Sequence, residues 1–110
     1  MSTMSDVRSV AAYTRTTNIL AGKPFEFAAA PSIVNVYIVA SAVGLRADVL
    51  IGGESVMSDE EVSGANRFPT TESDLTVRHG ANPGDRIFIS LRNTTGVAVT
   101  GNTLVEVLPL

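Results

Sequence analysis

The chain has 110 residues, which is enough for one domain and too few for a second independent core. Hydrophobic residues make up 45% of it and charged residues 17%, a balance that excludes an intrinsically disordered chain. The absence of Cys and the single His exclude disulfide frameworks, thiolate metal sites and metal sites that need two imidazoles. The net charge of −3 argues against nucleic acid as a partner, because phosphate contacts need a basic face.

Residues 1–14 are small and mostly polar, without the apolar run of a secretory signal, so we expect synthesis in a cytoplasm. Such a segment cannot bury enough surface to order itself. We therefore expect an extended N-terminal arm over 1–14, added to the sheet edge of a neighbouring chain, and a β-sandwich domain over 15–110. A chain without the arm would then fold but not assemble. The side chains expected to make contacts here are Val7, Arg8, Val10, Tyr13 and Arg15.

Short strands separated by turns are predicted after the arm. Residues 16–20 and 25–27 flank a turn that contains Gly22 and Pro24. Apolar residues at every second position predict strands over 33–40 and 45–51. Gly52 and Gly53 follow and suit a two-residue hairpin turn, because both positions tolerate positive φ. A short strand over 54–57 would return from this turn.

Residues 58–73 form a long polar stretch without strand periodicity. Loops of this length are uncommon in compact domains and are usually functional or mobile. Ser58 and Glu61 have the spacing of a capping box, which would give one short helical turn. Phe68 either anchors this loop to the core or contacts a partner, together with its neighbour Arg67.

The C-terminal part alternates strongly. Its predicted elements are strands over 75–79, 86–92, 97–100 and 103–108, with turns over 82–85 and 93–96. Gly101 and Asn102 interrupt the alternation as a bulge or a turn. With about eight short strands and no long helix, the pattern is that of an all-β protein, a single antiparallel β-sandwich or jelly roll.

No catalytic or metal-binding pattern emerges from the residue types. The acidic run 59–61 lacks the alternating oxygen ligands and the Gly of a calcium loop. His79, at the end of a predicted strand, is adequately explained as a surface histidine, and no Ser lies in a G-x-S-x-G elbow. Lys23 stands beside a proline in a turn, a poor place for a buried reactive amine. We therefore expect no enzyme, no cofactor and no metal.

Two features of composition concern partners. All but one of the eight basic residues are Arg, which is enriched in protein interfaces, although a GC-rich coding bias would produce the same excess. Aromatic residues make up 5% of the chain, with no Trp. Sugar-binding sandwiches stack a ring on Trp or Tyr, and only Tyr13 and Tyr37 are candidates here. This weakens a lectin interpretation and leaves it open.

The stretch 82–96, with its Asn-Pro-Gly-Asp turn, and the ending 99–109 resemble small β-sandwich structural proteins of phage virions. These include capsid decoration (cement) proteins and small jelly-roll coat subunits. The resemblance implies a protein located in the virion that multimerises on a shell, with itself or a major capsid protein as partner. It carries over no residue-level functional motif.

Two functions follow as hypotheses. The first is a non-enzymatic virion structural protein, a homo-oligomer that stabilises a shell through the arm and the loop 58–73 and contacts neither nucleic acid nor membrane. The alternative is a monomeric ligand-binding β-sandwich module for a carbohydrate or another small molecule, which predicts a concave site with ordered aromatic or polar side chains. Sedimentation at several concentrations distinguishes an oligomer from a monomer.

Overall fold

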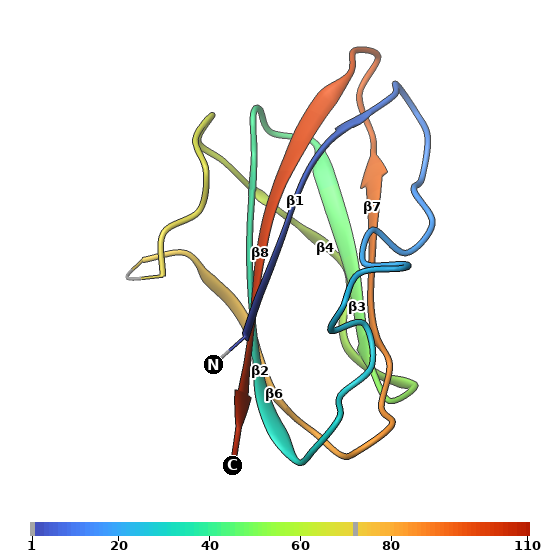
Figure 1. Ribbon diagram of the computed structural model, residues 1–110. Coiled ribbons are helices and arrows are strands. Elements are labelled where there is room, and N and C mark those ends of the chain that lie inside the picture. Colours follow the sequence, from blue (N-terminus) through green and yellow to red (C-terminus); the bar gives the residue numbers. More distant parts are fainter. Residues whose placement is uncertain (1, 72) are drawn as a thin grey trace.

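The computed structural model describes residues 2–71 and 73–110, and it places two β-sheets face to face (Figure 1). All of the regular structure in these residues is β-strand, as the sequence predicts. The strands are β1 (Ser2–Val10), β2 (Ser32–Ala40), β3 (Leu45–Ile51), β4 (Glu54–Glu61), β5 (Ser63–Gly64), β6 (Leu75–Ala81), β7 (Ile87–Asn93) and β8 (Val99–Pro109).

The larger sheet, sheet A, has the order β1-β8-β2-β6, with the short β5 beside the end of β2. The smaller sheet, sheet B, has the order β4-β3-β7. Neighbours are antiparallel except for β2 and β5. Residues 14–27 run along the free edge of β7 and take the place of a further strand of sheet B. The chain thus crosses between sheets in jelly-roll order, and the predicted β-sandwich is confirmed.

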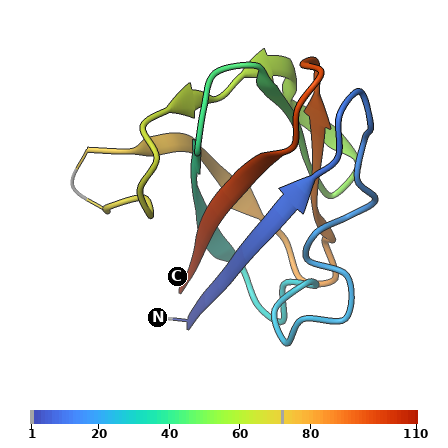
Figure 2. The same ribbon diagram turned by 90° about the horizontal axis from the view of Figure 1, so that it is seen from above.

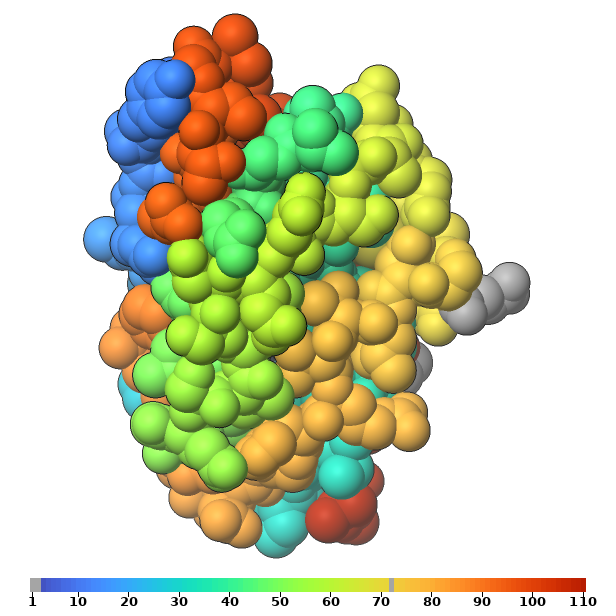
Figure 3. Space-filling view, turned by 180° about the vertical axis from the view of Figure 1, so that it is seen from behind, coloured from blue at the N-terminus to red at the C-terminus, as the bar shows by residue number. Residues whose placement is uncertain are grey.

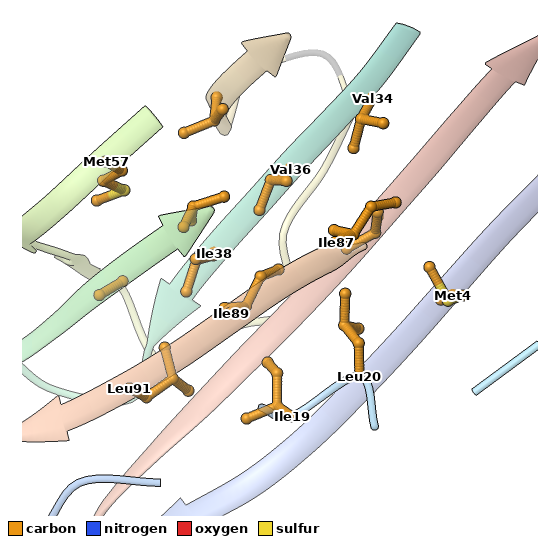
Figure 4. Packing of buried hydrophobic residues seen from close by; sticks show 14 of the residues in the cluster. Met4, Ile19, Leu20, Val34, Val36, Ile38, Met57, Ile87, Ile89 and Leu91 are labelled. Carbon is orange, nitrogen blue, oxygen red and sulfur yellow. The ribbon is translucent and has the colours of Figure 1, made fainter. Parts of the chain in front are cut away.

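The core lies between the sheets and consists of aliphatic side chains from alternate strand positions (Figure 4). Val34, Val36 and Ile38 of β2 face inward from sheet A, and each is at most 2% exposed. Ile87, Ile89 and Leu91 of β7 face inward from sheet B and are fully buried. Burial of each such side chain contributes about 1.5–3 kcal/mol, so these two strands supply much of the driving force for folding.

The predicted turns are present where glycine is needed. Gly52 and Gly53 have φ of 62° and 82°, the two positive values that the hairpin between β3 and β4 requires. Gly84 has φ of 86° in the turn before β7, where Asp85 N donates to Asn82 O at 3.0 Å. Across residues 2–71 and 73–110 there is no helix with the length and apolar character to span a membrane.

The N-terminal segment differs from the expected arm. Residues 2–10 form β1, which pairs with β8 along its whole length, from Ser2↔Val107 to Val10↔Val99. Met4 and Val10 on its inner face are 5% and 1% exposed and belong to the core. The segment is therefore an edge strand of the sandwich, and the boundary expected between 14 and 15 separates no domain from an arm. The prediction failed because Asp6 and Arg8 occupy inward positions and conceal the alternation.

Three further differences concern the irregular segments. Residues 16–20 and 25–27 form no strand, although isolated bridges at Arg15 and Phe27 and backbone hydrogen bonds, such as Ile19 N to Ile89 O at 2.9 Å, join this segment to the β7 edge. Residues 58–61 continue β4 and do not form a helical turn. The break expected at Gly101 and Asn102 is neither a bulge nor a turn, since β8 runs through it without interruption.

Candidate ligand-binding site

A hollow of about 280 Å³ opens on the side of the sandwich where β4 and β6 are neighbouring edges of different sheets. Figure 3 shows this side, with the end of β4 in yellow-green and β6 in gold. Three apolar residues line it, Ile38 from β2, Val62 and Leu75. Its polar lining consists of Glu61, Ser63, Ser73, Asp74 and Thr76. Ile38 and Val62 are each 2% exposed, so the accessible apolar surface comes mainly from Leu75, beside the hydroxyl and carboxylate groups.

The first wall is held in place by Val62, the residue between β4 and β5. Its side chain is 2% exposed, and its N–H donates to the carbonyl oxygen of Leu45 at 2.8 Å. Directly after it, Ser63 pairs with Val39 in the parallel bridge to β2. Because Val62 points into the core, Glu61 and Ser63 on either side of it are exposed to solvent. The alternation of a buried and an exposed position thus presents both polar groups to the hollow.

The second wall depends on an ion pair within the loop that joins β5 to β6. The two guanidinium nitrogens of Arg67 donate to the carboxylate of Asp74 at 2.5 and 2.8 Å, and Thr70 N donates to the same carboxylate at 2.7 Å. The Arg67 guanidinium, followed by the Thr70 N–H, holds the pKa of Asp74 well below its usual range. The loop, which projects from the side of the sandwich in Figure 2, is thereby closed on itself.

The loop is also attached to sheet A at two points. Asn102 Nδ2 on β8 donates to the carbonyl oxygen of Arg67 at 3.2 Å. Thr76 Oγ1 accepts from Ile38 N at 3.2 Å and donates to Asp74 O at 3.3 Å, next to a register shift between β2 and β6. The hydroxyl of Thr76 is therefore used by the fold and is not free to bind a ligand.

The polar groups left for a ligand are few. In the described part of the chain, the side chains of Glu61 and Ser63 have no hydrogen-bond or ion-pair partner, and Ser73 Oγ lies 2.9 Å from Thr70 Oγ1. Residues 2–71 and 73–110 contain no group of three His, Asp or Glu side chains able to hold a metal ion. What the hollow offers is hydrogen bonding to a neutral or hydroxylated molecule beside the exposed aliphatic side chain of Leu75.

The interaction residues predicted from the sequence lie in three separate places. Val7 on β1, Tyr13 in the turn after it and Phe68 on the loop are 64%, 75% and 43% exposed. Arg67 forms the clamp with Asp74 that holds the second wall of the hollow. Of these residues, only Arg67 contributes to the hollow, indirectly through the clamp.

The remaining predicted contacts are occupied within the chain. Arg8 pairs with Asp6 at 3.3 Å, and Arg15 forms an ion pair with Asp48. Val10 is buried in the core, which corrects its assignment to an exposed contact surface. Val10 is therefore inaccessible to a partner, whereas Arg8 and Arg15, with side chains 38% and 43% exposed, are paired within the chain and still reach the surface.

The two tyrosines considered as stacking platforms for a sugar differ in exposure. Tyr13 is exposed, but Tyr37 is 4% exposed and its hydroxyl donates to Glu106 Oε1 at 2.5 Å. The hydrogen bond to Glu106 raises the pKa of Tyr37. Tyr37 is therefore part of the outer face of sheet A and is not a stacking platform.

A cluster of charges that the sequence did not reveal covers the outer face of sheet B. Arg92 donates two hydrogen bonds to Asp59 at 3.0 and 2.8 Å, and Arg46 Nε lies 3.4 Å from the same carboxylate. Arg92, assisted by Arg46 and Arg15, lowers the pKa of Asp59. Since the charges compensate one another, we interpret this cluster as structural. The arginines at alternate strand positions are visible in the sequence. The cluster could not be predicted from them, because their carboxylate partners are distant in the sequence.

No protein-family model matches the chain, and no curated protein matches it. One solved structure to which it is similar is that of a carbohydrate-binding module, CBM36, in complex with calcium and xylotriose. The sequence identity is 18% and the TM-score 0.46, over 97% of this chain and 99% of that one. At this level of similarity we infer nothing about ligands from that protein. Fold and hollow define a jelly-roll β-sandwich protein with a small polar site at an open edge.

Proposed function

We propose that the protein is a non-catalytic ligand-binding module and that the hollow between β4 and β6 holds one ring-sized hydroxylated molecule, such as a sugar residue. The observation that carries this proposal is the combination, in one hollow, of the free Glu61 and Ser63 side chains with the aliphatic side chain of Leu75, which is 49% exposed. A sugar presents hydroxyl groups at its edge and C–H groups on its face, and this lining complements both. A volume of about 280 Å³ lies near the lower end for ligand sites and fits a single ring.

The clamp between Arg67 and Asp74 supports the proposal because it fixes the second wall before a ligand arrives. A bidentate Arg–carboxylate pair has a defined geometry, and a preformed wall reduces the entropy that binding would otherwise cost. A binding site without catalysis is also consistent with the carboxylates among the described lining residues. Glycoside hydrolysis needs two available carboxyl groups, whereas Asp74 is engaged by Arg67 and Thr70.

Nuclear magnetic resonance titration tests the proposal with the intact chain. Backbone amide shifts would be followed while a panel of monosaccharides and short oligosaccharides is added up to about 50 mM, because a shallow site of this size binds weakly. We expect at least one sugar to shift the amides of 61–63 and 73–76 selectively. No saturable shift in these residues with any member of the panel would contradict the proposal.

A matched pair of variants assigns the binding to the hollow. Glu61→Gln removes the charge of the lining carboxylate, and we expect it to weaken binding at least tenfold. Glu60→Gln changes the neighbouring exposed residue of β4, which does not line the hollow, and we expect unchanged affinity. Equal effects of the two substitutions would show that net charge, and not the hollow, determines binding.

A structural subunit of a phage virion is the second candidate, and the specific observation that favours it is the edge strand β1. This strand pairs only with β8 among the described residues and carries Val7, which is 64% exposed. A shell subunit would form extended assemblies through such an edge. Electron microscopy and light scattering of the concentrated protein test this function, which predicts sheets, shells or larger particles. Particles no larger than a small closed oligomer would contradict it.

A further inference from the structure

The strand β1 is the longest edge strand of sheet A. Its nine residues pair with β8 on one side, and within residues 2–71 and 73–110 no backbone hydrogen bond joins its other side to a second strand. It contains neither Pro nor Lys, the residues that most often protect such an edge. An edge of this kind is able to accept another strand.

We propose that the strand accepted by β1 is β1 of a second copy of this chain, antiparallel to it, with the two-fold axis at Val7. In this register Asp6 of each copy lies opposite Arg8 of the other, and the two Val7 side chains meet at the axis. Ser5 lies opposite Ser9 of the second copy. Sheet A would continue from one subunit into the other, and the dimer would be closed by its symmetry.

The faces of the strand restrict which registers are available. A two-fold axis perpendicular to the sheet keeps the inner faces of both copies on the same side, so an inner residue must lie opposite an inner residue. Only registers centred on a residue satisfy this condition, because a shift by one position would place an outer side chain opposite an inner one. The inner residues of β1 include Asp6 and Arg8, between the buried Met4 and Val10.

Charge then selects one of the remaining registers. An axis at Asp6 would place two aspartates opposite each other, and an axis at Arg8 would place two arginines opposite each other. Like charges directly across a strand pair destabilise it, and opposite charges stabilise it. The axis at Val7 brings both charges of each copy opposite a charge of the other sign. The sequence of β1 is thus complementary to itself about this single residue.

The ion pairs within one subunit are consistent with this arrangement. Asp6 lies 3.3 Å from Arg8 Nε and 3.7 Å from Lys23 Nζ, so its charge is compensated before a second copy arrives. Inward-pointing charges on an edge strand discourage pairing with arbitrary strands. Here the same charges would still permit the one register in which they are matched. They would therefore act as a selector for a second copy.

Sedimentation equilibrium of the intact protein tests the proposal. Joining through one strand buries less than a standard interface, so the dimer should form at roughly hundreds of micromolar, and the measurement must extend to about 1 mM. The apparent mass of wild type is expected to rise toward twice the 11.5 kDa of one chain. A mass that stays at 11.5 kDa up to this concentration overturns the proposal.

Substitution of Val7 locates the interface without disturbing the core. Val7→Lys places two ammonium groups side by side at the axis, and the dissociation constant is expected to rise at least tenfold. Val43→Lys is the control, because Val43 has a nearly equal exposure of 67% in the turn between β2 and β3. The proposed axis is overturned if Val7→Lys dimerises as wild type does, or if both substitutions weaken the dimer equally.

Charge exchange tests the register itself. Asp6→Arg alone and Arg8→Asp alone each place like charges opposite one another and are expected to abolish the homodimer. A mixture of the two variants restores opposite charges at every pair, and we expect a heterodimer to form. Circular dichroism checks that each variant is folded. If the mixture of folded variants stays monomeric, the register is wrong. These outcomes are independent of the hollow, since none of its lining residues is changed.

Discussion

The side-chain oxygen of Asn18 accepts a hydrogen bond from Ile89 N at 3.1 Å, in a position where sheet B would otherwise need another strand. The same oxygen accepts from Leu20 N at 3.1 Å, and Asn18 Nδ2 donates to Ile87 O at 3.3 Å. One amide side chain, only 4% exposed, therefore satisfies backbone groups on both sides of the gap. It allows the irregular segment 14–27 to lie along the β7 edge without being a strand.

The first prediction is that Asn18→Ala destabilises the fold by about 3 kcal/mol, because it leaves buried backbone groups of Leu20, Ile87 and Ile89 without their partner. Urea denaturation followed by circular dichroism measures this change. Asn82→Ala is the control, since Asn82 is exposed and its side chain makes no described hydrogen bond. Its effect should stay within about 0.5 kcal/mol. Equal effects of the two would contradict the role of Asn18.

The second prediction concerns Gly101 in the interior of β8. A Cβ at this position would lie 2.6 Å from Leu91 Cδ1 and 3.1 Å from Leu45 Cδ2, both in the core. We expect Gly101→Ala to cost about 1–3 kcal/mol through overpacking. Gly80→Ala, in β6, meets no atom within 4 Å and should be neutral or slightly stabilising. Thermal denaturation of both variants checks the contrast, which would fail if they melted alike.

The third prediction is that deleting residues 1–10 prevents stable folding. The deletion removes Met4 and Val10 from the core and exposes the edge of β8 along its length. Loss of two buried apolar side chains alone costs about 4 kcal/mol, a large part of the stability of a small domain. Circular dichroism and thermal denaturation should show no cooperative transition. A folded, cooperative truncated chain would restore the interpretation of 1–14 as an arm.

The fourth prediction is an effect of pH on the loop that carries the clamp. The pKa of Asp74 is lowered in the folded chain, first by Arg67. A carboxyl group with a lowered folded pKa stabilises the fold above its unfolded pKa and loses this contribution as the pH falls toward the folded value. The clamp should therefore be intact at neutral pH and weaken only below about pH 4.

Carboxyl-carbon chemical shifts in an acid titration measure the midpoint for Asp74 directly. Arg67→Gln should raise this midpoint toward the ordinary value for an aspartate, and the loop should open at a higher pH. Arg78→Gln serves as the control because Arg78 donates to Asn35 Oδ1 and does not contact Asp74. A midpoint that does not move in Arg67→Gln would show that the guanidinium is not the cause of the shift.

The strands that the sequence predicted correctly are those in which local composition and burial agree. Over 33–40, 45–51 and 86–92, apolar residues at every second position point into the core. The Gly52–Gly53 turn follows β3 and the Asn82–Asp85 turn precedes β7, as expected. The prediction failed at β1, because Asp6 and Arg8 occupy inner positions and are paired with charges outside the pattern. Alternation detects a strand only when its inner side chains are apolar.

The candidate site was less predictable than the fold. The sequence points only to Arg67, as a contact for a partner, whereas in the structure Arg67 pairs with Asp74 seven residues later in the sequence. Glu61 and Ser63 carry no distinguishing motif and acquire meaning only because Val62 between them is buried. The hollow arises where β4 of one sheet passes the edge of β6 of the other, and no local pattern encodes that approach.

By itself, the sequence determined an all-β domain with its main strands and turns, since period-two alternation and the φ preferences of Gly and Pro are properties of adjacent residues. Only the tertiary structure decided that residues 2–10 complete sheet A, that Asn18 substitutes for a strand, and that two sheet edges leave a hollow between them. These features depend on contacts between residues distant in the chain, whose partners are chosen by how the two sheets pack.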